Sequence, residues 1–133
     1  WVPDMINLAS AVSMVPGGGV RDQEIDWGQV AAFRPDVVLV APRGMSLAES
    51  SRSFPFFENI PEWEKLPAVR RGEVFFCDGQ VHFYCPGPRL LESMGILISA
   101  VAGFESGYIT DRDLFHRLRW LEMQRHRFSE EKK

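Results

Sequence analysis

The chain has 133 residues, enough for one domain with a hydrophobic core. Hydrophobic residues make up 45% of it and charged residues 25%, as in an ordinary globular protein, and no apolar run is long enough to predict a membrane span. The net charge is −3, and the signs are too mixed for a dedicated nucleic-acid-binding protein. Residues 112–133 are net positive and residues 1–111 net negative, which indicates that the last segment is a separate element.

The first part of the chain predicts two helices and one strand. Pro3 suits the first turn of a helix that ends before the glycine-rich loop at 16–19. Asp26 can cap a short helix that runs through Phe33. The continuous apolar run Val37–Ala41 is bounded by prolines and rich in β-branched residues, so we expect a fully buried strand of the parallel type.

The middle of the chain predicts further helices around a second strand. A helix is expected from Ser46 to about Ser53, broken by Pro55, and another over Pro61–Val69. Val74–Cys77 is a short apolar strand, and Pro88 begins a helix to about Ala102 that is apolar nearly all round. Because strands alternate with helices, the predicted fold class is α/β: a small three-layer parallel sheet with helices on both faces.

The last segment predicts an additional amphipathic, basic helix that begins at Thr110. An apolar stripe marks one side of it, and arginines cover the rest. The stripe consists of Leu114, Leu118, Leu121 and Phe128.

Two loops that follow the predicted strands form the candidate ligand site. The carboxyl ends of parallel strands lie at one end of a sheet, so segments 42–45 and 78–86 should share a rim. Arg43 can hold a carboxylate, phosphate or amide oxygen, and aromatic rings can cover a large flat ligand. The simpler interpretations are a solvated turn at Arg43 and aromatic side chains that cover the edge of the core. The candidate ligand-binding residues are Arg43, Gly44, Met45, His82, Phe83 and Tyr84.

The same region leaves other chemistry open. Cys77, Asp78, His82 and Cys85 supply potential zinc ligands, although their spacing is not a standard zinc-finger pattern. Cys85 with His82 is a weaker candidate for a cysteine hydrolase, because no orienting group or oxyanion loop is evident. The two cysteines can pair across the loop or remain free thiols. We expect neither catalytic residues nor a bound cofactor.

Five segments of the sequence, in the order in which they occur, resemble the second lobe of the substrate-binding proteins of bacterial ABC importers. The branch is the one that carries cobalamin, haem and iron-siderophores, with two lobes joined by a rigid helix. The matching segments are 1–9, 25–30, 34–42, 63–75 and 86–91. The resemblance assigns residues 1–104 to the C-terminal lobe, without the lobe's first strand and without the N-terminal lobe. Residues 105–133 form the extra helix and tail.

This resemblance implies a non-enzymatic ligand-binding lobe for a large metal chelate such as cobalamin, haem or a ferric siderophore. The six candidate residues would touch the chelate, and a second lobe, or a second copy of the chain, would complete the grip. The location would be periplasmic or otherwise extracytoplasmic. The family docks on its permease through an acidic residue, but the matching position is Gly28, which argues against docking unless Asp26 or Glu24 substitutes. The alternative is a transport-inactive relative that binds partners through its C-terminal helix.

Overall fold

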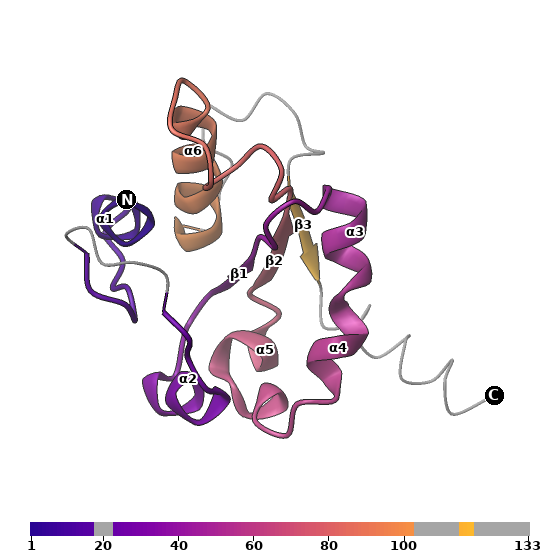
Figure 1. Cartoon of the computed structure of the whole chain (residues 1–133). Helices are drawn as coiled ribbons and strands as arrows, with labels where there is room; N and C mark the ends of the chain where they lie inside the picture. The colour runs from indigo at the N-terminus through magenta and orange to yellow at the C-terminus, as the bar shows by residue number, and fades with distance from the viewer. Residues whose placement is uncertain (18–22, 103–114, 119–133) are drawn as a thin grey trace.

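The computed structural model describes residues 1–17 and 23–102, together with the backbone of residues 115–118. Short helices and strands alternate along the chain (Figure 1). The helices are α1 (Val2–Leu8), α2 (Trp27–Phe33), α3 (Leu47–Arg52), α4 (Phe54–Glu58), the 3-10 helix η1 (Trp63–Lys65), α5 (Pro67–Arg71) and α6 (Leu90–Ala102). The strands are β1 (Val38–Val40), β2 (Val74–Cys77) and β3 (Phe115–Leu118). Among these described helices, none combines the length and apolar character of a membrane span.

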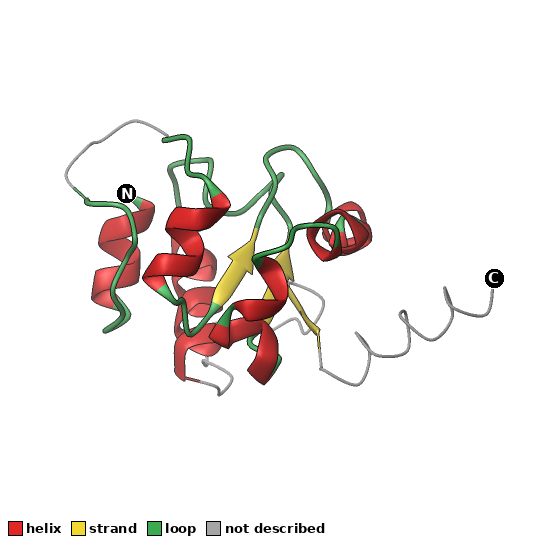
Figure 2. Ribbon diagram, turned by 90° about the horizontal axis from the view of Figure 1, so that it is seen from below, coloured by secondary structure: helices red, strands yellow, loops and turns green. Residues whose placement is uncertain are grey.

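The sheet has the strand order β1-β2-β3. Strands β1 and β2 are parallel, with Val38 opposite Val74 and Val40 opposite Phe76. Strand β3 is antiparallel to β2, so the described sheet is mixed, while the two strands predicted from the sequence pair in parallel as expected. Helices lie on both sides of the sheet (Figure 2), which confirms the predicted α/β class.

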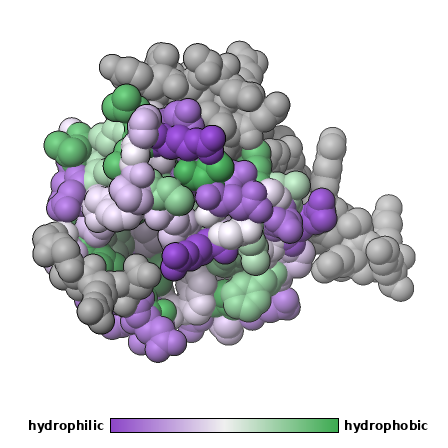
Figure 3. Space-filling model, turned by 45° about the horizontal axis from the view of Figure 1, so that its top comes forward, coloured by the Kyte–Doolittle hydropathy of each residue, from purple (hydrophilic) through white to green (hydrophobic). Residues whose placement is uncertain are grey.

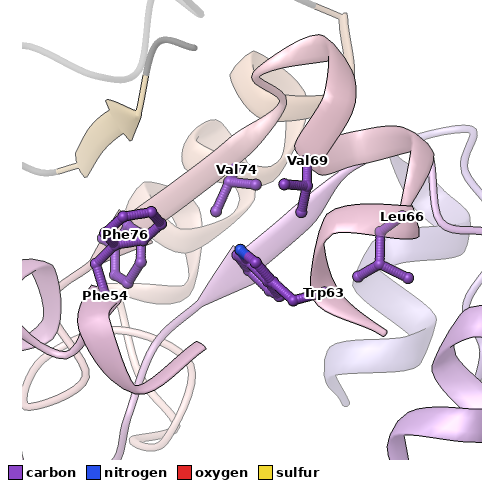
Figure 4. Packing of buried hydrophobic residues seen from close by; sticks show 6 residues of the cluster. All are labelled: Phe54, Trp63, Leu66, Val69, Val74 and Phe76. Atoms are coloured by element: carbon purple, nitrogen blue, oxygen red, sulfur yellow. The ribbon is translucent and has the colours of Figure 1, made fainter. Parts of the chain in front are cut away.

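One face of the sheet carries an aromatic core. Val38 and Val40 of β1 join it, together with side chains of α2, α4, η1 and α5. Trp63 lies at its centre, 1% exposed, with its ring centroid 4.8 Å from that of Phe57 and 5.9 Å from that of Trp27. The buried residues of this cluster, drawn in Figure 4, are Phe54, Trp63, Leu66, Val69, Val74 and Phe76.

The other face carries a second cluster, beneath α1 and α6. Leu39 and Ala41 of the β1 region point to this face, because side chains alternate along a strand. Its buried members are Met5, Cys77, Phe83, Ile96 and Leu97. The two clusters on opposite faces make the predicted three-layer arrangement.

Local sequence signals set most helix boundaries. The Asp26 side chain accepts a hydrogen bond from the Gln29 backbone N–H, and the Gln29 side chain accepts one from the Asp26 N–H, a capping box that starts α2 as predicted. Ser46 and Glu49 make the same motif at α3. Pro67 begins α5 because a proline is tolerated in a first turn, so the single helix predicted over Pro61–Val69 is split into η1 and α5.

Two further predictions need correction. The run around Val38–Val40 was expected to be fully buried, but its residues are only partly buried because β1 is an edge strand. Strand β2, in the middle of the sheet, is buried throughout. Residues 115–118 form a strand where the basic helix was predicted, since pairing with β2 satisfies backbone groups that an unpaired edge leaves exposed. The remainder of that predicted helix, with Thr110 and Phe128, lies outside the described residues.

Candidate ligand-binding rim

The loops after β1 and β2 meet at one end of the sheet, as the sequence predicted. The backbone N–H of Gly44 donates to the carbonyl oxygen of Gly79 at 3.2 Å, and the N–H of Gly79 donates to that of Met45 at 2.8 Å. The side-chain amide of Gln80 donates to the carbonyl oxygen of Gly44 at 3.1 Å. We call segments 42–45 and 78–86 together the rim. These bonds continue the pairing of β1 and β2 beyond the strands, so the rim backbone is held in a fixed shape.

Gly79 allows this close approach. A Cβ atom at this position would lie 1.9 Å from the carbonyl oxygen of Pro42, far inside van der Waals contact. Gly44 has a different role, since its φ of 80° lies in the left-handed region that glycine adopts without strain. Gly79 is therefore required because a side chain would not fit there, and Gly44 because its φ angle is positive.

Arg43 and Tyr84 are neighbouring exposed side chains of the rim. The Tyr84 hydroxyl donates to the carbonyl oxygen of Ala41 at 2.6 Å, which ties the second loop to the end of β1. The Arg43 guanidinium carbon lies 5.8 Å from the centroid of the Tyr84 ring, within cation–π range. Met45, 40% exposed, adds a flexible apolar side chain. The set combines a cation, an aromatic ring and a thioether on an exposed surface.

Within the rim, the structure buries the side chains of His82 and Phe83 beneath its exposed residues. His82 is fully buried and Phe83 is 6% exposed. The Ser93 hydroxyl of α6 accepts a hydrogen bond from the Phe83 N–H at 3.3 Å and lies 3.4 Å from His82 Nδ1. It also donates to the carbonyl oxygen of Arg89 at 3.2 Å. Ser93 thus connects the aromatic loop to the first turn of α6.

The second ring nitrogen of His82 is an unpaired polar atom. Nε2 is buried and has no hydrogen-bond partner among the described residues. Burial lowers the pKa of His82 because the imidazolium would lose its hydration. The carboxylates of Glu92 and Asp78 oppose this shift, whereas Arg89 adds to it. His82 is therefore held as the neutral imidazole, a packed side chain with unused hydrogen-bonding capacity.

Two further interactions support the rim. The Trp1 indole N–H donates to the carbonyl oxygen of Phe83 at 3.1 Å, so α1 holds the aromatic loop across a separation of 82 residues. The Asp78 carboxylate accepts from the backbone N–H groups of Gln80 and Val81, which folds the start of the second loop.

The described residues do not assemble the alternative zinc site. No three side chains of histidine, cysteine, aspartate or glutamate gather in this part of the structure as metal ligands would. Both cysteines are free, Cys77 buried and Cys85 exposed. Burial, with a smaller contribution from the Asp78 carboxylate, raises the pKa of the Cys77 thiol to about 12, which disfavours the thiolate that zinc needs.

The surface at the top of the molecule mixes polar and apolar groups. Figure 3 turns the top of the molecule forward and shows hydrophilic and hydrophobic residues interspersed over that face.

Gly28 and Asp26, the positions considered for docking on a permease, lie at the other end of the sheet. The carboxylate of Asp26 caps α2. The Cβ of a residue replacing Gly28 would lie 3.0 Å from Asp26 Oδ1.

The fold is a small α/β domain in which two loops form an exposed rim at one end of the sheet. A family model described as periplasmic binding protein matches residues 1–81, and the chain belongs to this family. The family is the one that the sequence motifs indicated, with members for cobalamin, haem and siderophores, and its proteins bind substrates and in general are not enzymes. The match includes the first rim segment and Gly79, and it ends just before His82. Searches of curated proteins and of solved structures found no match.

Proposed function

We propose that this chain is a ligand-binding lobe of a substrate-binding protein for a large, partly apolar metal chelate such as cobalamin, haem or a ferric siderophore. The observation that carries the proposal is the paired rim: two loops of a periplasmic binding protein fold are bonded together at the carboxyl ends of parallel strands, where ligands of α/β sheets bind. Segments far apart in the sequence thereby form one surface.

The exposed rim residues suit such a chelate. Arg43 can donate to the carboxylates of haem, the amide or phosphate oxygens of cobalamin, or the oxygen donors of a siderophore. Tyr84 and Met45 offer apolar area to the flat face of the chelate. His82 and Phe83 support this surface from below through the bonds of Ser93 and Trp1, so they set the position of Tyr84.

A single lobe covers one side of a ligand. Binding must offset the lost freedom of the ligand, and an open surface excludes less water than an enclosed cleft. We therefore expect weak binding by this chain and a large gain when a second lobe closes over the rim.

The transport partner and the location belong to the same proposal. If the family role is kept, the protein works outside the cytoplasm and delivers its chelate to an ABC permease. The docking acid is replaced by Gly28, and Asp26 already caps α2, so docking would rely on other residues or has been lost.

Isothermal titration calorimetry with cyanocobalamin, haem and ferrichrome tests the ligand class. We expect one of these three chelates to bind with a dissociation constant above about 1 µM. Arg43→Ala should weaken that binding by about tenfold, which corresponds to about 1.4 kcal/mol. Arg52→Ala is the matched control, an exposed arginine on α3 outside the rim, and should bind as the wild type. Absence of heat with all three chelates, or equal losses in both variants, would contradict the proposed site.

A further inference from the structure

Phe83, in the middle of the aromatic loop, has a backbone conformation that residues with a side chain disfavour. Its φ of 71° lies in the positive region that favours glycine. Three interactions hold it there: its N–H donates to the Ser93 hydroxyl, its carbonyl oxygen accepts from the Trp1 indole, and its ring is buried in the cluster beneath α1 and α6. Such a conformation persists only where the surrounding contacts determine it. The closed aromatic loop is therefore strained, and the loss of one contact favours its opening.

The hydrogen bonds of Ser93 determine which nitrogen of His82 carries the hydrogen. The Ser93 hydroxyl donates its one proton to the carbonyl oxygen of Arg89 at 3.2 Å. It can therefore only accept from His82 Nδ1, which lies 3.4 Å away and must carry the hydrogen of the neutral ring. Nε2 then holds a lone pair, and it is buried without a hydrogen-bond partner among the described residues.

A second proton on His82 conflicts with this arrangement. It would make Nε2 a charged donor at a buried place where the described residues supply no acceptor, and an unpaired buried charge costs far more than an unpaired lone pair. Within the described chain, the charged groups that act on the ring are Glu92 and Arg89 of the α6 region and Asp78 at the end of β2. Burial outweighs the two carboxylates, so the pKa of His82 lies below its ordinary value of 6.5. The neighbouring Cys77 thiol, with a pKa of about 12, stays neutral in this range.

We propose that the aromatic loop is an acid-sensitive switch: protonation of His82 opens residues 82–84, Phe83 leaves its strained conformation, and Tyr84 loses its position on the rim. The hydrogen bond from the Tyr84 hydroxyl to Ala41 and the contact with Arg43 are then lost together. The opening is local, because the bonds that hold the loop lie outside the pairing of β1 with β2. Weaker chelate binding in mild acid follows, and only that consequence rests on the proposed function.

Hydrogen exchange of single backbone amides, followed by NMR on the chelate-free protein from about pH 7.5 to about pH 5, tests the switch. The rates are corrected for the pH dependence of exchange in an unstructured chain. Below about pH 6.5, protection of the Phe83 amide should fall by up to about tenfold per pH unit. It should stay below the protection of the Phe76 amide in β2 at every pH, because the loop opens without the sheet. In His82→Gln, protection of the Phe83 amide should not depend on pH.

Two substitutions in the α6 region change the charge near His82 and leave the loop itself intact. Arg89→Gln removes a cation and raises the pKa of His82 in the closed loop, so the total loss of protection in acid should be smaller. Glu92→Gln removes a carboxylate and lowers that pKa, so the loss should be larger and continue to lower pH. Arg52→Gln and Glu64→Gln, which make the same charge changes on α3 and η1, are the matched controls and should follow the wild type.

Three results overturn the switch. The first is a Phe83 amide whose protection is constant below about pH 6.5 in the wild type, and the second is an equal fall in His82→Gln. The third is equal protection of Phe83 and Phe76 at every pH, because the loop would then open only when the whole domain unfolds. For a chelate that binds at neutral pH, the wild type should lose affinity in acid more steeply than His82→Gln. Failure of every chelate to bind counts against the proposed function alone, because the exchange is measured without one.

Discussion

The hydroxyl of Tyr84 donates a hydrogen bond of 2.6 Å to the carbonyl oxygen of Ala41, which joins the aromatic loop to the end of β1. Tyr84→Phe keeps the ring under Arg43 and removes this bond. We expect unfolding in urea to show a loss of about 0.5–1.5 kcal/mol, the usual net value of one hydrogen bond. Tyr84→Ala also removes the cation–π contact and should weaken chelate binding more than Tyr84→Phe. Equal chelate affinity in the two variants would show that the ring makes no contribution to the site.

A methyl group at Gly79 should disrupt the rim. In Gly79→Ala the new Cβ meets the carbonyl oxygen of Pro42, a backbone atom that moves only if the paired loops separate. The cost should be about 1–3 kcal/mol in denaturant unfolding, as for other overpacked sites.

Gly44→Ala is the control for the Gly79 substitution. It meets no atom within 4 Å, and its penalty arises only from a φ of +80°, at about 1 kcal/mol. A Gly79→Ala protein that loses less stability than Gly44→Ala would mean that the two loops are not held together as the structure has them.

The sequence was sufficient for the elements that local signals determine. Asp26 and Ser46 are the N-cap residues at which α2 and α3 begin. The apolar runs around Val38 and Val74 form the two parallel strands. The shared rim followed from the rule that parallel strands end together. No local pattern could reveal that Ser93 bonds the aromatic loop, because that contact depends on how α6 packs.

The errors came from tertiary context. The segment at 115–118 has a helical apolar period, yet its backbone pairs with β2, because a sheet edge offers hydrogen bonds that local propensity does not record. Likewise, the sequence identified an aromatic loop but could not predict which of its side chains are exposed. In the structure Tyr84 is exposed and His82 is buried.

The two cysteines should react at very different rates. Burial raises the pKa of Cys77 to about 12, so its reactive thiolate is scarce, whereas Cys85 is exposed. Iodoacetamide at about pH 8 should alkylate Cys85 in the folded protein and both thiols in denaturant, as measured by mass spectrometry of peptides. Cys85→Ser should then leave the folded protein unlabelled. A folded wild type labelled at Cys77 would contradict the burial of β2, and one labelled at neither cysteine would indicate a disulfide.

The buried imidazole of His82 should make the protein sensitive to mild acid. Its pKa is lowered in the folded state, chiefly by burial, from an ordinary value of 6.5 that applies after unfolding. Below that value the unfolded chain binds a proton that the folded chain binds less readily. The contribution of His82 to stability is thus complete above about pH 6.5 and is lost as the pH falls toward the lower, folded-state pKa, with a slope of at most about 1.4 kcal/mol per pH unit.

Urea unfolding of the wild type and of His82→Gln, measured at intervals from pH 7.5 to pH 5, tests this contribution. Glutamine cannot titrate, so the variant should lose less stability over the range, although it is less stable at neutral pH. Ser93→Ala separates packing from titration: it leaves the Phe83 N–H without its partner and should cost about 1–3 kcal/mol at every pH, while the acid sensitivity remains. Parallel pH profiles for the wild type and His82→Gln would show that His82 is solvated and that the aromatic loop does not cover it.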